Sequence, residues 1–110
     1  YLRPAMEAEN SLVLVALEGE LVVGYSYSFI VEPSSLNKRE RYGNIHDMFI
    51  TTQYRRKGIA NIMFSEITNW FHSNNINRVE LDVITQNQGA SSFWEKLGFK
   101  DLNRTLYRQI

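Results

Sequence analysis

The spacing of the apolar residues changes from that of a strand to that of a helix between residues 51 and 59, and this change limits the folds open to the chain. Residues 44–51 carry a short apolar core typical of a strand. The apolar residues after it recur at intervals of three and four over about four turns, which predicts an amphipathic helix. They are Ile59, Ile62, Met63, Ile67, Trp70 and Phe71. Val79, Leu81 and Val83 then alternate with acidic residues, which predicts a second strand.

A strand, a helix and a strand joined by short connections form a right-handed crossover between parallel strands. Upstream, residues 12–18 and 21–32 are rich in β-branched and aromatic side chains and flank a short turn, which predicts an antiparallel hairpin. Gly24 within the second of these strands indicates a bulge or a close backbone approach. Residues 2–10 are expected to form the last turns of a helix, with the proline in its first turn. The expected fold class is therefore α/β, built on a mixed sheet.

The carboxyl-terminal part of the chain predicts a further helix and strand. The helix is expected to begin at residue 88 or 89, to run to Leu97 and to stop at Gly98. Residues 99–110 are then expected to hold one or two final strands. No linker or internal repeat divides the chain, so we expect a single domain over residues 1–110.

The composition excludes several classes of function. Lys plus Arg and Asp plus Glu number 12 each, so no net charge attracts nucleic acid or an anionic membrane. The absence of cysteine excludes disulfides, cysteine-ligated zinc and a cysteine nucleophile. His46 and His72 do not form a metal-ligand spacing, so no metal site is expected. No apolar run approaches the roughly 20 residues that span a bilayer, no signal peptide is visible, and a cytoplasmic location is expected.

The long helix begins with charges of the unexpected sign. Helix N-termini carry a partial positive charge and favour acidic residues in the first turn. Here the basic run Arg55-Arg56-Lys57 comes first, and no acidic residue follows before Glu66. A bound polyanion would compensate for these cations, and Gly58 would let the backbone approach it closely. On charge alone, a basic cluster that merely faces solvent remains open as the alternative.

Two segments resemble the sequence motifs of one protein family. Ile45-His46-Asp47-Met48-Phe49-Ile50, followed by Arg55-x-x-Gly58-x-Ala60, is similar to motif A of the GNAT superfamily of N-acetyltransferases. Glu80-Leu81-Asp82-Val83, followed by Asn87-x-x-Ala90-x-x-Phe93-Trp94-Glu95-Lys96-Leu97-Gly98-Phe99, is similar to motif B of that family at the matching separation. The core motifs thus span residues 44–99. The resemblance implies a GNAT fold whose usual amino-terminal strand and two helices are shortened or missing here.

The resemblance also implies a site for acetyl-CoA between two parallel strands that splay apart. Backbone groups of residues 48–50 would pair with the pantetheine arm, and one of their N–H groups would stabilise the oxyanion. Backbone N–H groups from Arg56 to Asn61 would hold the pyrophosphate with the help of Arg55. Asn87 would hold the pantetheine or cap the second helix. The expected cofactor-binding residues are Met48, Phe49, Ile50, Arg55, Arg56, Lys57, Gly58, Ile59, Ala60, Asn61 and Asn87.

The same resemblance implies direct attack of an amine on acetyl-CoA in a ternary complex. His46 and Asp47 are the candidate bases, with a structural hydrogen bond as the alternative role for each. Adjacent strand residues point to opposite faces, so at most one of the two faces the acceptor unless a bulge intervenes. Trp94 stands where many relatives have a tyrosine that acts as the acid, and its alternative role is core packing. Tyr107, on the expected last strand, is the candidate substitute for that acid.

The expected partner is a small-molecule or protein amine, and a homodimer is among the expected assemblies. A non-catalytic CoA-binding or regulatory module of the same fold is the alternative function. A phosphate-binding α/β domain unrelated to acyl transfer is a third reading.

Overall fold

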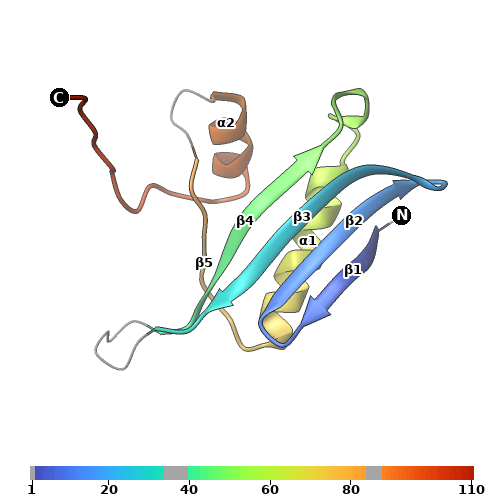
Figure 1. Cartoon of the computed structure of the whole chain (residues 1–110), viewed down its shortest axis with the longest axis horizontal. Coiled ribbons are helices and arrows are strands. Elements are labelled where there is room, and N and C mark those ends of the chain that lie inside the picture. The colour runs from blue at the N-terminus through green and yellow to red at the C-terminus, as the bar shows by residue number, and fades with distance from the viewer. Residues whose placement is uncertain (1, 34–39, 84–87) are drawn as a thin grey trace.

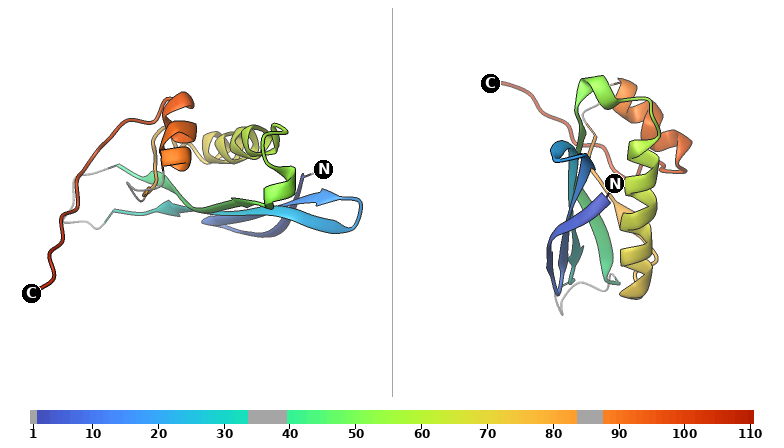
Figure 2. Two further views of the ribbon diagram at one scale, coloured as in Figure 1. Left: turned by 90° about the horizontal axis from the view of Figure 1, so that it is seen from above. Right: turned by 90° about the vertical axis from the view of Figure 1, so that its right-hand side faces the viewer.

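A computed structural model describes residues 2–33, 40–83 and 88–110 (Figure 1). The elements are β1 (Leu2–Ala8), β2 (Ser11–Glu18), β3 (Leu21–Val31), β4 (Tyr42–Ile50), the 3-10 turn η1 (Thr52–Tyr54), α1 (Ile59–Ser73), β5 (Val79–Glu80) and α2 (Gln88–Lys96). The strands form one sheet in the order β1-β2-β3-β4-β5, antiparallel except for the parallel pair β4–β5. Both helices lie on the same side of this sheet (Figure 2). The mixed α/β sheet expected from the sequence is therefore confirmed.

The hairpin of β2 and β3 contains the irregularity that Gly24 predicts. The pairing between the two strands shifts next to Gly24, where Val23 is an extra residue on β3. A Cβ atom on Gly24 would lie 2.9 Å from the backbone oxygen of Phe49 on the neighbouring strand. The bulge and the close backbone approach are both present, and glycine is needed because no side chain fits between β3 and β4 at this point.

The first segment is a strand, so the helix expected over residues 2–10 is wrong. β1 pairs with β2 from Leu2 opposite Ala16 to Ala8 opposite Ser11. The free edge of β2 offers backbone partners to this segment, and such long-range pairing overrides local helix propensity. Pro4 is tolerated because β1 is the edge strand of the sheet. A strand thus precedes the hairpin, and among the described residues no helix does.

Helix α1 buries one apolar stripe against the sheet, as its spacing predicts. Met63, Ile67 and Phe71 recur every fourth residue and are at most 1% exposed. The remaining core residues are Leu12, Leu14, Ala16, Val23, Ile30, Ile45, Ile50 and Ile76. The core therefore lies between α1 and one face of β2, β3 and β4.

The carboxyl end of α1 closes in a Schellman motif. Asn75 adopts a left-handed conformation with φ of 63°. The N–H of Ile76 donates to the carbonyl of Phe71 at 2.9 Å, and the N–H of Asn75 donates to that of His72 at 3.0 Å. Since Phe71 and Ile76 are both buried, this turn also fixes where the chain leaves the helix for β5. His72 is exposed in the last turn, where a cation suits the helix dipole.

Helix α2 matches its expected range and ends in the same motif. Gly98 has φ of 95°, and the N–H of Phe99 donates to the carbonyl of Trp94 at 3.1 Å. Ring contacts join α2 to α1, because the centroid of Trp94 lies 6.1 Å from that of Phe64 and 5.4 Å from that of Phe99. The packing role considered for Trp94 is therefore confirmed, although its ring partners are on α1 and on the segment after α2.

Residues 99–110 form no helix or strand, so the final strands expected there are wrong. A strand needs a partner with a free backbone edge, and β5, which comprises only Val79–Glu80, offers a short one. Residues 100–110 are exposed throughout.

Nowhere among the described residues is there a helix long and apolar enough to cross a bilayer.

The two faces of the sheet differ in cover. The face that carries the core lies beneath α1, whereas no described helix or strand covers the opposite face (Figure 2). We call this opposite side the outer face. Strand alternation places Tyr25, Tyr27 and Phe29 of β3 on it, and Phe49 of β4 lies opposite Tyr25. Tyr25 and Phe49 are 40% and 47% exposed.

Gly43→Ala is expected to destabilise the protein because a Cβ atom at this position would overlap the buried ring of Phe71. Overpacking of this kind costs about 1–3 kcal/mol. The measurement is the midpoint of urea unfolding. The dependence of the unfolding free energy on urea concentration is compared with that of the wild type, to check that the transition stays two-state.

Ser28→Ala is the matched control in the same part of the core. Ser28 is 0% exposed, and its hydroxyl has no hydrogen-bond partner among the described residues. Removal of an unsatisfied hydroxyl is expected to be neutral or stabilising by about 1 kcal/mol. Equal stability of Gly43→Ala and the wild type would contradict the packing of α1 described above.

Candidate functional site

The site begins where β4 and β5 part. The two strands pair only at Gly43 with Val79 and at Asn44 with Glu80. β5 ends there, so the strand expected to reach Val83 is shorter than predicted, while β4 continues to Ile50. Beyond Asn44, the side of β4 that faces away from β3 therefore has no strand partner among the described residues. Backbone groups on this free edge are available to an extended ligand.

A groove with a volume of about 550 Å³ lies beside this free edge. It is lined by Met48, Phe49, Ile50, Tyr54, Arg55, Arg56, Gly58, Ile59, Ala60, Asn61, Gly89, Ala90, Phe93 and Trp94. The groove thus brings together the end of β4, the loop before α1, the first turn of α1 and one side of α2. Every cofactor-binding residue expected from the sequence lines it except Lys57 and Asn87. Asn87 lies outside the described residues.

The loop before α1 leads into a helix terminus that no side chain caps. Arg56 and Gly58 both have left-handed conformations, with φ of 64° and 80°. Gly58 is the N-cap residue of α1 and provides no side-chain cap, and the first turn holds no acidic residue. The first helical hydrogen bond runs from the N–H of Ile62 to the carbonyl of Gly58 at 3.1 Å. The N–H groups of residues 59–61 therefore have no carbonyl partner within the helix, and they form an anion-binding terminus.

The three cations of the loop occupy different positions. The Nε of Arg55 donates to the carbonyl of Ile50 at 2.8 Å, and its guanidinium lies 5.6 Å from the ring centroid of Phe49. The Nζ of Lys57 lies 5.2 Å from the ring centroid of Tyr54. Within the described part of the chain, no carboxylate pairs with any of the three. Their charges are therefore uncompensated, and Arg55 also fastens the loop to the end of β4.

His46 and Asp47 lie at a bulge in β4. Asp47 pairs with Tyr27 and Ile45 with Ser28, so His46 is the extra residue between them. A bulge interrupts the alternation of side chains, and both His46 and Asp47 are exposed. The ring of His46 contacts that of Tyr27 at 5.8 Å between centroids, which places it on the outer face. The bulge that the sequence allowed as an exception is thus present, and both candidate bases face away from α1.

The structure does not bring Tyr107 into the groove. Tyr107 lies in the segment after α2 that has no regular structure, and it is 85% exposed. Trp94 does line the groove, but its indole is also packed against Phe64 and Phe99. An indole N–H is a donor that does not exchange its proton as a phenol does. Tyr54 is the one tyrosine among the groove-lining residues, but it lies in η1 beside Lys57 and not on α2, so it does not occupy the position of the tyrosine acid.

Five residues that line the groove were not predicted as site residues: Tyr54, Gly89, Ala90, Phe93 and Trp94. Ala90 and Phe93 belong to the second motif quoted above, so its spacing was the available signal. Tyr54 carried no signal of its own, because its place in the groove depends on η1 and on its contact with Lys57.

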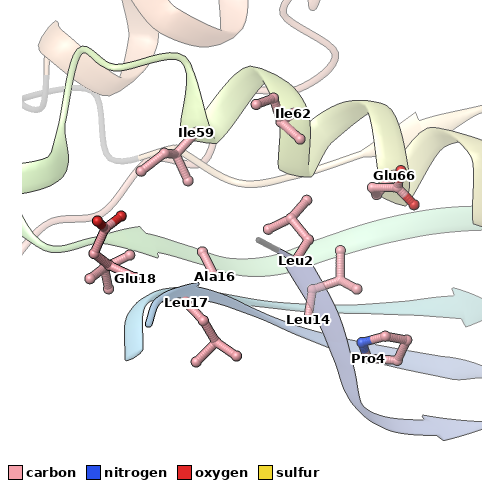
Figure 3. Close-up of a pocket in the computed structure, with 10 residues that line it drawn as sticks. Leu2, Pro4, Leu14, Ala16, Leu17, Glu18, Ile59, Ile62 and Glu66 are labelled. Atoms are coloured by element: carbon pink, nitrogen blue, oxygen red, sulfur yellow. The ribbon is translucent and has the colours of Figure 1, made fainter. Parts of the chain in front are cut away.

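A second cavity of about 440 Å³ lies between β1, β2 and the first half of α1 (Figure 3). Its floor is formed by buried core residues such as Leu14 and Ala16, and Glu18 and Glu66 stand at its rim. Ile59 is the residue it shares with the groove. The cavity lining includes no cation and no histidine. Among the described residues, no group of three or more His, Asp or Glu side chains is placed to hold a metal ion.

Comparison with known proteins places these features in a family. Residues 1–99 match the family model described as "Acetyltransferase (GNAT) family". L-ornithine N5-acetyltransferase NATA1 of Arabidopsis thaliana is 33% identical over 82 residues, which are 74% of this chain and 35% of that protein. The probable N-acetyltransferase san of Drosophila melanogaster is 31% identical over 97% of this chain and 62% of its own length. The chain thus spans about a third to under two thirds of these relatives.

Solved structures share the fold. A tetramutant of the BH1408 protein from Bacillus halodurans has a TM-score of 0.83 and 24% identity over 94% of this chain and 69% of that one. The aminoglycoside N-acetyltransferase AAC(6')-Iy, solved in complex with CoA, has a TM-score of 0.80 and 14% identity over 94% of this chain and 78% of that one. At these identities the likeness shows the fold, and it confirms the arrangement expected from the two motifs.

Arg55→Met is expected to lower the free energy of unfolding by about 1 kcal/mol, because the carbonyl of Ile50 loses its charged donor. Arg55→Lys keeps the charge but lacks Nε, so it is expected to lose a similar amount. Urea unfolding measures both, with Arg104→Met in the exposed tail as the control. Wild-type stability in both variants would show that Arg55 does not fasten the loop to β4.

Proposed function

Because this chain belongs to the acetyltransferase (GNAT) family, we propose that it is an N-acetyltransferase that moves the acetyl group of acetyl-CoA to a primary amine. The observation that carries the proposal is the joint presence of an anion-binding helix terminus and a free strand edge in one groove. CoA has a pyrophosphate and an extended pantetheine arm with amide groups. One ligand of this shape uses both features at once, which a simple phosphate or a nucleotide does not.

The pyrophosphate is proposed to lie against the amides of residues 56–61. These N–H groups, the positive end of the α1 dipole and three uncompensated cations all favour a polyanion there. Gly58 leaves open space, because nothing lies within 4 Å of the position a Cβ atom would take. The structure of AAC(6')-Iy in complex with CoA supports this ligand for a protein of the same fold.

The pantetheine arm is proposed to run along the free edge of β4 at residues 48–50. The carbonyl of Ile50 is already bonded to Arg55, and Phe49 pairs through its backbone with Tyr25 of β3, so the backbone groups of Met48 and the N–H of Ile50 are the ones available to pair with the arm. The thioester then lies near Phe49, with a backbone N–H of this stretch donating to its oxygen. On one side of the groove the rings of Phe93 and Trp94 exclude water from this arm.

The proposed reaction is direct attack in a ternary complex. The lone pair of the neutral amine forms a bond to the thioester carbon, and the oxygen takes up the charge of a tetrahedral intermediate. The C–S bond breaks as the carbonyl reforms, the amine nitrogen loses a proton, and the CoA thiolate gains one. His46 or Asp47 is proposed to take the proton from the amine, directly or through a water molecule. The thiolate is proposed to take its proton from water, because the tyrosine that lines the groove, Tyr54, lies beside Lys57 in the loop before α1 and not on α2.

The acceptor is proposed to be a primary amine. The name of the Arabidopsis relative gives L-ornithine N5 as its acceptor, and several of the fold neighbours are named as aminoglycoside N-acetyltransferases. These proteins act on small molecules that carry amines. A small-molecule acceptor is therefore favoured for this chain over a protein amine.

A thiol-release assay tests the proposed activity. The protein is mixed with acetyl-CoA and a panel of amines, and free CoA is followed with a thiol reagent. Release that depends on both the protein and particular amines is the expected result. Binding of CoA without release in any amine mixture would favour the non-catalytic module of the same fold.

Gly58→Glu is expected to abolish CoA binding, because a carboxylate at this position repels the pyrophosphate and fills the space it needs. Isothermal titration with CoA measures the affinity, and a loss of at least a hundredfold is expected, which is about 3 kcal/mol.

Gly58→Asn is the matched control for backbone strain. Asparagine tolerates the left-handed conformation and carries no charge, so both variants are expected to keep a cooperative unfolding transition. Unchanged CoA affinity in Gly58→Glu would contradict the proposed place of the pyrophosphate.

A further inference from the structure

Three rings gather on the outer face at the bulge of β4. Tyr27 and Phe29 belong to β3, and their centroids are 5.5 Å apart. The imidazole of His46 completes the group, at 5.8 Å from Tyr27 and 6.0 Å from Phe29. We call these three residues the aromatic cluster. The two β3 rings are only half-buried, so the cluster offers ring surface to a ligand.

A carboxylate stands beside the aromatic cluster. Asp47 lies directly opposite Tyr27 in the sheet, so their Cβ atoms are about 5 Å apart. Asp47 is exposed, and no hydrogen bond or ion pair joins it to another described residue. Ring faces and a carboxylate both attract cations, and together they form the setting in which proteins hold organic ammonium groups. The bulge creates this setting because it turns His46 and Asp47 to the same side.

The other end of the same face repels a cation. Phe49 is in contact with Tyr25, at 6.2 Å between centroids, and the guanidinium of Arg55 already lies near its ring. A free ammonium group therefore favours the end of the face at Asp47. Asp47 and Phe49 are two positions apart on the strand, which corresponds to about 7 Å.

We propose that the acceptor is an aliphatic diamine, held by one ammonium group at Asp47 and the aromatic cluster while its other amine attacks the thioester near Phe49. The proposal rests on the proposed function, which places the thioester at this point. A chain of four or five methylene groups spans the distance between the two nitrogens. The positive charge near Phe49 also favours the neutral, reactive form of the amine at that end. Asp47 is then a specificity-determining residue, and the proton of the attacking amine passes to water.

The experiment compares 1,4-diaminobutane with n-butylamine, which has the same chain and one nitrogen fewer. The ratio of kcat/KM for the two acceptors is measured with acetyl-CoA by thiol release. A ratio of about ten or more is expected for the wild type, beyond the advantage of having two equivalent amines. Asp47→Asn is expected to bring the ratio down roughly tenfold, and Phe29→Leu severalfold. Glu20→Gln, in the exposed hairpin turn, is the control for a lost carboxylate and is expected to leave the ratio unchanged.

Because the test uses the ratio of the two kcat/KM values, any loss of activity that affects both acceptors equally cancels. Such losses include the loss of a catalytic base and partial unfolding. Equal use of the two amines by the wild type would overturn the inference and leave the acetyltransferase standing. So would a loss in Asp47→Asn that is equal for both, because Asp47 would then serve the reaction and not the second charge. No release with either amine, while CoA still binds, would contradict the proposed function and the inference together.

Discussion

The contact between Phe71 and Gly43 joins helix α1 to β4 at the point where β4 and β5 begin to separate. Phe71 is 1% exposed, and its ring occupies the space above Gly43 that any other residue would fill with a side chain. Gly43 is also where β4 pairs with β5, since its N–H donates to the carbonyl of Arg78 at 2.8 Å and its partner in the sheet is Val79. Helix α1, β4 and β5 therefore meet at this point. From there β4 continues beside β3 but without β5, and a groove opens between it and α2.

The groove follows from this divergence, and its chemistry follows from the loop at the far end of α1. The helix that is anchored by Phe71 begins after its N-cap Gly58, where amides without helical partners and the side chains of Arg55 and Arg56 lie at one end of the groove. The free edge of β4 supplies backbone groups along its length. A ligand that is anionic at one end and carries amides along an extended arm matches both, so the fold itself selects the kind of cofactor. The outer face, on which the acceptor is proposed to lie, is shaped separately by the bulge at His46.

Much of the fold was predictable from local sequence patterns. The period of the apolar residues in α1 and the basic run before Gly58 both depend on neighbours in sequence. The first correctly predicted a helix, and the second predicted the anion site that is proposed here. The secondary structure at the two ends of the chain was not predictable in this way. β1 forms only because it pairs with β2, whereas the segment after Gly98 has no such partner. The bulge that turns His46 and Asp47 to one face depends on the register of β4 against β3. The spacing of residues along the sequence does not determine that register. The side of the sheet on which these two residues lie therefore could not be predicted without the structure.

The most direct test of the account is a backbone amide NMR map of the protein during titration with CoA. The largest shifts are expected on residues 56–61 and on Met48 and Ile50, with smaller ones on the first turns of α2. The aromatic cluster on the outer face would change little until an amine is added. Shifts centred on the second cavity, around Leu14, Ile62 and Glu66, or the absence of any shift at saturating CoA, would contradict it.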